Sequence, residues 1–351
     1  MAGVDADAKL TEARKNEHLK VVAENKVEWG ETWLDDVVLV HQTMPEINLD
    51  DVDTSVTFLG HAYALPLNIS GMTGGTAAAK QINRGLAEAA QRAGVSMGVG
   101  SQRAMISNPA LLDTYAVRDV APDILLFANI GISHVKKYSP EQIRAAVEAI
   151  GANVLCVHLN PAQEIFQNEG DWDFSGAADA LKTFCENVGY PVVAKEVGHG
   201  ISMESAKIVK ECGVVAIDVQ GSGGTSWAYI DSLRSGKDAT NFKAWGVPTA
   251  AAILECKGLG LPVIGSGGVR SGTDIAKCIA LGADMTGIAL PMLKAVNAGG
   301  PEAVVLYIEK LKTELRYAMF LTGSRNIEEL KKARYVLTGR LADWAKQRGL
   351  L

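Results

Sequence analysis

A chain of 351 residues with 48% hydrophobic and 21% charged residues has the composition of a soluble globular protein. Its formal net charge of −6 argues against broad nucleic-acid binding, so an anionic ligand needs locally concentrated Arg, Lys and backbone N–H groups. No apolar run reaches the roughly 18 residues that a membrane span needs, and the start MAGVDADAKL has no apolar signal core. The five cysteines are scattered without a C-x-x-C pair, which indicates reduced thiols in a cytoplasmic protein.

The first 64 residues precede the repeating part of the sequence. Residues 7–25 are charged and helical in period, and Arg14, Lys15 and His18 lie within about one turn, so they can converge on one object. A solvated charged helix is the commoner explanation of such a cluster. Short strands are expected at 37–42 and 55–58, where they would plug or cap one end of a barrel.

From residue 65 onward, short apolar runs alternate with amphipathic segments. The apolar runs predict strands at 65–70, 95–99, 124–128, 154–159, 192–195, 214–219, 261–264 and 285–289. The amphipathic segments predict helices at 80–93, 140–150, 176–187, 202–211 and 273–281. Eight strand-then-helix units predict a closed parallel (β/α)₈ TIM barrel, although a doubly wound open sheet would also alternate.

The stretch from Leu261 to Ala289 favours closure. A strand leads into Gly265, Ser266, Gly267 and Gly268, and Ser271 or Thr273 can cap the helix that follows. A glycine turn at a helix N-terminus between the last two strands is a typical phosphate site of a barrel. Taken alone, the same loop fits a plain connection with turn glycines about as well.

We expect a single domain over 1–351. It would comprise an N-terminal extension and barrel cap over 1–64, a barrel core over 65–300 and C-terminal helices over 301–351, with helical segments near 302–322 and 326–347. Two separate domains are also possible by length. The interval 220–248, rich in Gly, Ser, Trp and Lys, is interpreted as a long loop that orders over a ligand.

Nearly every predicted strand ends in polar or glycine-rich residues, which would share the carboxyl rim where barrel active sites lie. The motifs, in chain order, are SGMTGG at 70–75, Ser101 with Gln102 and Arg103, Asn129, HLNPAQE at 158–164, Lys195, GSGGT at 221–225 and Arg270. His158 and Asn160 point to one face of a strand, and Glu164 suits a hard divalent cation that shares phosphate oxygens. The constellation predicts a flavin mononucleotide barrel that acts on an anionic substrate.

These motifs resemble the type 2 isopentenyl-diphosphate isomerase family, which is flavin-dependent. The likeness covers nearly the whole chain through RKNEHL, SGMTGG, GSQR, HLNPAQE, KEVGHG, DVQGSGGTSW and GSGGVRSGTDIAK, in that order. The resemblance implies interconversion of isopentenyl and dimethylallyl diphosphate with reduced FMN, Mg²⁺ and NADPH or NADH as the reductant of the flavin. It also implies a homo-oligomer, a tetramer or an octamer.

The resemblance assigns site residues one by one. The implied FMN contacts are Ser70, Gly71, Met72, Thr73, Ser101, Asn129, Lys195, Thr225, Gly268, Val269, Arg270, Ala289 and Leu290. The implied substrate contacts are Arg14, Lys15, Ser101, Gln102, Arg103 and Gln163. His158, Asn160 and Gln163 would serve catalysis, and Glu164 would bind Mg²⁺. Asp231 stands where a longer acid is expected, and its role is left open.

The implied reaction adds a proton to the alkene and removes one from the neighbouring carbon, with no net redox change. An unactivated C=C is a poor base, so a strong acid and a dry pocket are needed. The alternative reading is an FMN-dependent 2-hydroxy-acid oxidase or dehydrogenase, which shares the phosphate loop. A non-catalytic flavin- or nucleotide-binding barrel is the third possibility.

Overall fold

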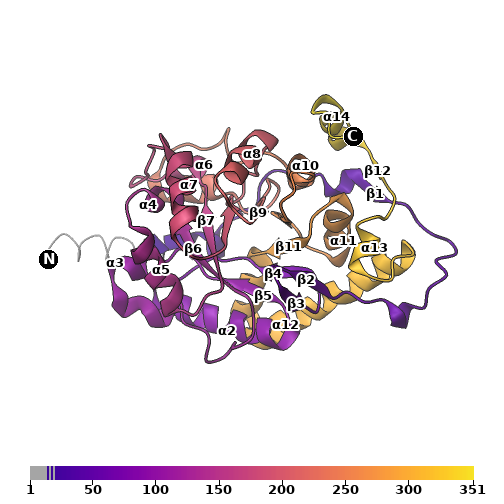
Figure 1. The fold of residues 1–351 in the computed structure, drawn as a ribbon, viewed down its shortest axis with the longest axis horizontal. Helices are drawn as coiled ribbons and strands as arrows, with labels where there is room; N and C mark the ends of the chain where they lie inside the picture. Colours follow the sequence, from indigo (N-terminus) through magenta and orange to yellow (C-terminus); the bar gives the residue numbers. More distant parts are fainter. Residues whose placement is uncertain (1–13, 16, 19) are drawn as a thin grey trace.

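Eight parallel strands close into a barrel at the centre of the molecule, with helices around it (Figure 1). The computed structural model describes residues 14–15, 17–18 and 20–351. The barrel strands are β4 (Leu67–Ile69), β5 (Ser96–Gly98), β6 (Leu126–Gly131), β7 (Val154–His158), β8 (Val192–Lys195), β9 (Ala216–Asp218), β10 (Val263–Ser266) and β11 (Met285–Ile288). β11 pairs in parallel with β4, which closes the ring. The predicted TIM barrel is confirmed. Six strands lie within their predicted runs, whereas β6 and β10 extend beyond residues 128 and 264, where their runs were expected to end.

The helices follow the strands along the chain. They are α2 (Ala77–Ala93), α3 (Arg103–Ser107), α4 (Ile132–Val135), α5 (Pro140–Ala149), α6 (Pro161–Glu164), α7 (Ala177–Asn187), α8 (Met203–Glu211), α9 (Trp227–Ser235), α10 (Thr249–Cys256), α11 (Gly272–Leu281), α12 (Leu290–Leu321), α13 (Ile327–Leu330) and α14 (Gly339–Gln347), with short 3-10 turns η1 (Leu34–Asp36), η2 (Leu49–Asp51) and η3 (Pro109–Thr114). Ser271 rather than Thr273 caps α11, in a reciprocal capping box with Asp274. None of the helices in the described ranges is long and apolar enough to cross a membrane.

A hairpin closes the amino end of the barrel. Strands β2 (Val56–Phe58) and β3 (His61–Tyr63) pair antiparallel, and Phe58 and Tyr63 pack with inward-facing side chains of the barrel. Those side chains include Leu125, Phe127 and Ile264, all buried. The predicted plug is therefore present, and it leaves the carboxyl end for the polar residues.

The first predicted N-terminal strand does not cap the barrel. β1 (Val37–Leu39) pairs antiparallel with β12 (Tyr335–Leu337) outside the barrel, beside α14 (Figure 1). The expectation that 37–42 plugs the barrel was wrong, and so was a continuous helix over 326–347. Gly339 explains the break, because its φ is +52° and a Cβ atom there would lie 2.5 Å from the Asp36 carboxylate.

Two further boundaries differ from prediction. The interval 220–248 contains helix α9, whose start is capped by the Ser226 hydroxyl and whose end is Gly236 at φ +74°. Helix α12 begins at Leu290 and bends at Gly299 and Gly300, so these residues make a kink at the expected boundary of the barrel core. At the N-terminus, the described residues up to 24 are helical, and residues 7–13 of the predicted helix lie outside the described part of the chain.

Candidate active site

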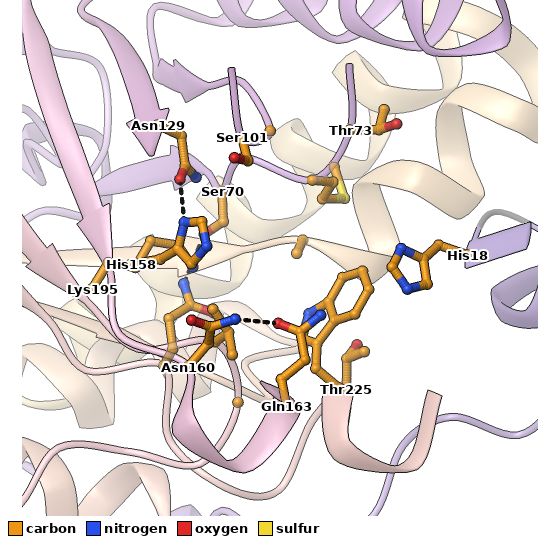
Figure 2. Close-up of a pocket in the computed structure, with 18 of the residues that line it drawn as sticks. His18, Ser70, Thr73, Ser101, Asn129, His158, Asn160, Gln163, Lys195 and Thr225 are labelled. Atoms are coloured by element: carbon orange, nitrogen blue, oxygen red, sulfur yellow. Dashed lines mark hydrogen bonds between the residues drawn. The ribbon is translucent and has the colours of Figure 1, made fainter. Parts of the chain in front are cut away.

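One pocket opens at the carboxyl ends of the barrel strands (Figure 2). It holds about 1530 Å³ of free space, counting its open mouth. The predicted site residues that line it are Arg14, Lys15, Ser70, Gly71, Met72, Thr73, Ser101, Arg103, Asn129, His158, Asn160, Gln163, Glu164, Lys195, Thr225, Gly268, Arg270, Ala289 and Leu290. The fold thus gathers residues that are almost 280 positions apart in the sequence at one cavity.

Two glycine loops form one end of the pocket. A Cβ atom at Gly268 would lie 2.4 Å from the carbonyl oxygen of Gly223, and one at Gly224 would lie 2.5 Å from the Gly268 nitrogen. Gly268 has a φ of +70°, a conformation that favours glycine. Because only bare backbone fits here, at the N-terminus of α11, the loops suit a phosphate.

Arg270 and Val269 follow the second glycine loop, and Arg270 lines the pocket. The Arg270 guanidinium forms an ion pair with Glu28 and donates to the Val269 carbonyl at 2.7 Å. The Arg270 backbone N–H donates to Asp274 at 3.0 Å. The Val269 side chain is buried and does not line the pocket. Arg270 therefore pairs with Glu28 beside the glycine loops.

His158 and Asn129 form a fixed pair on the wall of the pocket (Figure 2). His158 Nδ1 lies 2.7 Å from Asn129 Oδ1. An amide oxygen only accepts, so Nδ1 carries the proton and Nε2 keeps its lone pair. Burial, helped by the nearby charge of Lys195, lowers the pKa of His158 to about 3. The imidazole is therefore neutral.

Asn160 and Gln163 continue this wall beyond the end of β7. Asn160 Nδ2 donates to Gln163 Oε1 at 3.1 Å and to Glu164 Oε1 at 2.7 Å. Gln163 Nε2 donates in turn to Asp231 Oδ2 at 2.8 Å. The amide of Gln163 is thus held at both ends in a single orientation.

Asp231 is the anchor of this network. Its buried carboxylate lies 2.8 Å from His18 Nε2 and accepts from Arg234 at 2.5 Å. Burial raises the pKa of Asp231, but the hydrogen bond and charge of His18, with the hydrogen bonds from Gln163 and Arg234, outweigh that effect and lower the pKa overall. The acid whose role the sequence left open therefore ties the N-terminal helix to α6 and α9.

Three cations crowd the other end of the pocket. Arg14 donates to Gln167 at 3.1 Å, and Lys15 Nζ donates to the Ser101 carbonyl at 3.0 Å. Burial, with the charges of Arg14 and Arg103, lowers the pKa of Lys15 to about 7. An anion bound here would relieve the mutual repulsion, so these residues do converge rather than form a solvated face.

Gln102 does not reach the pocket. It is 2% exposed, and its Nε2 donates to the Ala146 carbonyl at 2.8 Å. Its backbone N–H donates to the Asn129 carbonyl at 2.8 Å. The prediction of a substrate contact does not fit this geometry, because the start of α3 directs the side chain into the protein. Gln102 instead holds Asn129 in place.

Glu164 is the carboxylate that faces the pocket near the cations. Burial raises its pKa, and its Oε2 accepts from the Asp171 backbone N–H at 2.8 Å. Across the residues that the structure describes, no group of three His, Cys, Asp or Glu side chains could hold a metal. A cation at Glu164 would have to share its other ligands with water or a bound anion.

Known proteins resemble this chain over nearly its whole length. A family model for FMN-dependent dehydrogenases matches residues 17–162 and 160–337. The isopentenyl-diphosphate delta-isomerase of Methanoregula boonei is 44% identical over 95% of this chain and 95% of its own. That of Methanothermobacter thermautotrophicus is 45% identical over 96% of both. The chain belongs to the type 2 isopentenyl-diphosphate delta-isomerase family.

Solved structures with the same fold lie further away in sequence. A mandelate oxidase variant superposes with a TM-score of 0.63 at 19% identity, covering 88% of this chain and 90% of that chain. A Pediococcus acidilactici protein described as a lactate oxidase gives 0.65 at 16% identity, covering 87% and 84%. These likenesses show that this chain shares its fold with those two proteins.

Several side chains of this type 2 isomerase that were given no individual role also line the pocket, among them His134, Gln220 and Trp227. Burial, with Arg103 and Lys137 nearby, lowers the pKa of His134 to about 3. Trp227 meets His18 edge to face at a centroid distance of 5.1 Å. His134 and Trp227 follow predicted strand ends closely enough that rim position alone could have suggested them.

Proposed function

We propose that this chain interconverts isopentenyl and dimethylallyl diphosphate, with reduced FMN and Mg²⁺, as a step that supplies isoprenoid precursors. The observation that carries the proposal is the presence of two anion sites in one pocket. Glycine loops at the tips of β9 and β10 suit the FMN phosphate, and Arg14, Lys15 and Arg103 suit a diphosphate.

The pocket also fits a flavin ring. A Cβ atom at Gly71 would lie 2.2 Å from the Val99 carbonyl, and one at Gly100 would lie 2.6 Å from the Thr73 nitrogen. Side-chain bulk is therefore excluded where strands β4 and β5 end, which leaves a flat face of backbone. The residues that would surround the cofactor are Ser70, Met72, Thr73, Ser101, Asn129, Lys195, Thr225, Ala289 and Leu290. When bound and reduced, FMN would supply the acid that an alkene requires.

The protein's own groups would position the alkene and exclude water. His158 is neutral, and Asn160 and Gln163 are locked by hydrogen bonds, so none of them brings a free charge next to the hydrocarbon. Fixed dipoles in a dry pocket stabilise developing positive charge without having to reorganise. Trp227 and Leu293 add apolar walls.

The diphosphate end would be held by cations and Mg²⁺. Arg14, Lys15 and Arg103 would bind the phosphate oxygens, and Glu164 would provide the protein ligand of the metal. Mg²⁺ usually keeps several waters and shares substrate phosphates, which is consistent with a single carboxylate. Holding the diphosphate in this way also opposes its loss as a leaving group.

The remaining parts of the proposal rest on the resemblance of the motifs. NADPH or NADH would reduce the flavin, the active form would be a homo-oligomer of four or eight chains, and the enzyme would work in the cytoplasm.

One experiment tests the function directly. The purified protein should show oxidised flavin bands that NADPH or dithionite bleaches, and isomerase activity should appear only after bleaching. The product should have the mass of the substrate with a shifted double bond. A two-hydrogen difference would instead support the oxidase alternative, and a colourless protein that takes up no FMN would overturn the proposal.

A further inference from the structure

Tyr115 does not line the pocket, yet it contacts three segments that build it. Its hydroxyl lies 2.5 Å from Lys15 Nζ and donates to the Ser101 carbonyl at 2.8 Å. A Cβ atom at Gly74 would lie 2.0 Å from its ring, so the ring packs directly on the backbone of the SGMTGG loop. The side chain is fully buried.

The three polar atoms form a closed triangle. Lys15 Nζ donates both to the Tyr115 hydroxyl and to the Ser101 carbonyl, which also accepts from Tyr115. Burial raises the pKa of Tyr115, so the phenol keeps its proton and uses both its donor and its acceptor capacity here. The partners of this hydroxyl are Lys15 and Ser101, and both of these residues line the pocket.

The triangle is fixed to the flavin-facing loop. A Cβ atom at Gly75 would lie 3.1 Å from Lys15 Nζ and 3.2 Å from the Tyr115 hydroxyl, so the ammonium lies directly over this glycine. The Gly75 N–H donates to Thr114 Oγ1 at 2.7 Å, and Asn83 Nδ2 donates to both the Thr73 and Thr114 carbonyls. These bonds set the position of Tyr115 relative to the loop.

We infer that Tyr115 is a positioning residue for the substrate: its hydroxyl holds the Lys15 ammonium at the diphosphate end of the pocket while its ring rests on the flavin-facing loop. The inference rests on the proposed function, in which Lys15 binds the diphosphate. Without the hydroxyl, Lys15 would keep one hydrogen-bond acceptor among the described residues, the Ser101 carbonyl, and its long side chain would have to be ordered further when the anion binds. That ordering weakens binding.

A double-mutant cycle on the FMN-loaded protein tests this. Titration calorimetry with Mg²⁺ and inorganic pyrophosphate should show Tyr115→Phe binding about tenfold more weakly than wild type, close to the lower end of what one hydrogen bond to a charged group contributes. In the Lys15→Met background, the same Tyr115→Phe change should alter pyrophosphate binding by less than about twofold, because coupled residues are not additive. In turnover, KM for the diphosphate should rise while kcat stays within about twofold.

Two measurements separate positioning from a loss of structure. FMN affinity of Tyr115→Phe should equal that of wild type, and Tyr63→Phe, which removes a hydroxyl without a partner in the described structure, should bind pyrophosphate normally. The inference would be overturned if Tyr115→Phe weakened pyrophosphate binding as much in the Lys15→Met background as in wild type, or if it weakened FMN and pyrophosphate binding equally. Isomerase activity of the wild type would still support the proposed function in that case. Absence of that activity in the wild type would overturn the function itself.

Discussion

The two anion-binding ends of the pocket are built in different ways. The end assigned to the FMN phosphate is backbone, made by the glycine loops 221–225 and 265–268. The end assigned to the diphosphate is made of side chains from the N-terminal helix and α3, and its partners Tyr115 and Gln167 lie just after η3 and α6. A backbone site forms once its loops adopt their conformation, whereas a side-chain site also requires residues from separate segments of the chain to meet. Changes at the first end should remove the flavin, and changes at the second should separate substrate binding from flavin binding.

The largest effect is expected at the backbone end. Gly268→Val should weaken FMN binding about 1,000-fold, equivalent to about 4 kcal/mol, because the new side chain would overlap the Gly223 carbonyl. Fluorescence titration with FMN measures this. Gly258→Val is the matched control, since Gly258 has a φ of +79° but no atom within 4 Å of its Cβ position. Equal losses in both variants would mean that backbone strain, and not the close approach of the loops, matters.

Glu164→Gln tests the diphosphate end of the pocket. We expect turnover to fall about 300-fold, as for loss of one group that stabilises charge in a transition state, while FMN affinity stays unchanged. Steady-state kinetics at saturating Mg²⁺ and flavin titration give the two values. Glu186→Gln on the exposed face of α7 should behave as wild type. Full activity of Glu164→Gln would remove the carboxylate from the metal site.

Changes to Arg14 and Lys15 should affect the binding of pyrophosphate but not of FMN. Arg14→Ala combined with Lys15→Ala should weaken pyrophosphate binding about 100-fold, because each lost charged hydrogen bond is worth about 1.5 kcal/mol. FMN affinity should change by less than about twofold. Calorimetry on the same preparation measures both. Unchanged pyrophosphate affinity would refute the assignment of these two residues.

The smallest effect is a pH dependence. Since the pKa of Lys15 is lowered to about 7, the free protein loses the ammonium as the pH rises above that value. Pyrophosphate binding should therefore weaken between pH 7 and 8.5, by at most about tenfold per pH unit. Lys15→Arg should flatten this part of the profile, because a guanidinium stays charged. Identical profiles for both proteins would contradict a titrating lysine in the site.

Local sequence patterns were sufficient for the barrel and for the backbone end of the pocket. Strands β4 to β11 are short apolar runs, and each glycine loop is contiguous in the chain. The geometry of such a loop follows from a few neighbouring residues, because the sequence shows directly which positions are glycine and so have no side chain. The motif HLNPAQE is equally local, and the structure places Asn160, Gln163 and Glu164 within hydrogen-bonding reach of one another.

The side-chain end depends on pairings that sequence patterns do not encode. Asp231 meets His18 across 213 positions, and Tyr115 meets Lys15 across 100. Gln102 was misread because its neighbours Ser101 and Arg103 face the pocket, whereas the turn into α3 directs Gln102 to Ala146. The strand β12 was hidden within helical periodicity because its partner, β1, lies some 300 residues earlier.

The pairing of β1 with β12 joins the two ends of the chain outside the barrel. Beside it, the Asp36 carbonyl accepts from the Thr338 N–H and the Asp36 carboxylate accepts from the Leu341 N–H. The segment that follows Arg14 and Lys15 is therefore anchored to the last strand and the last helix, although neither of these elements reaches the pocket.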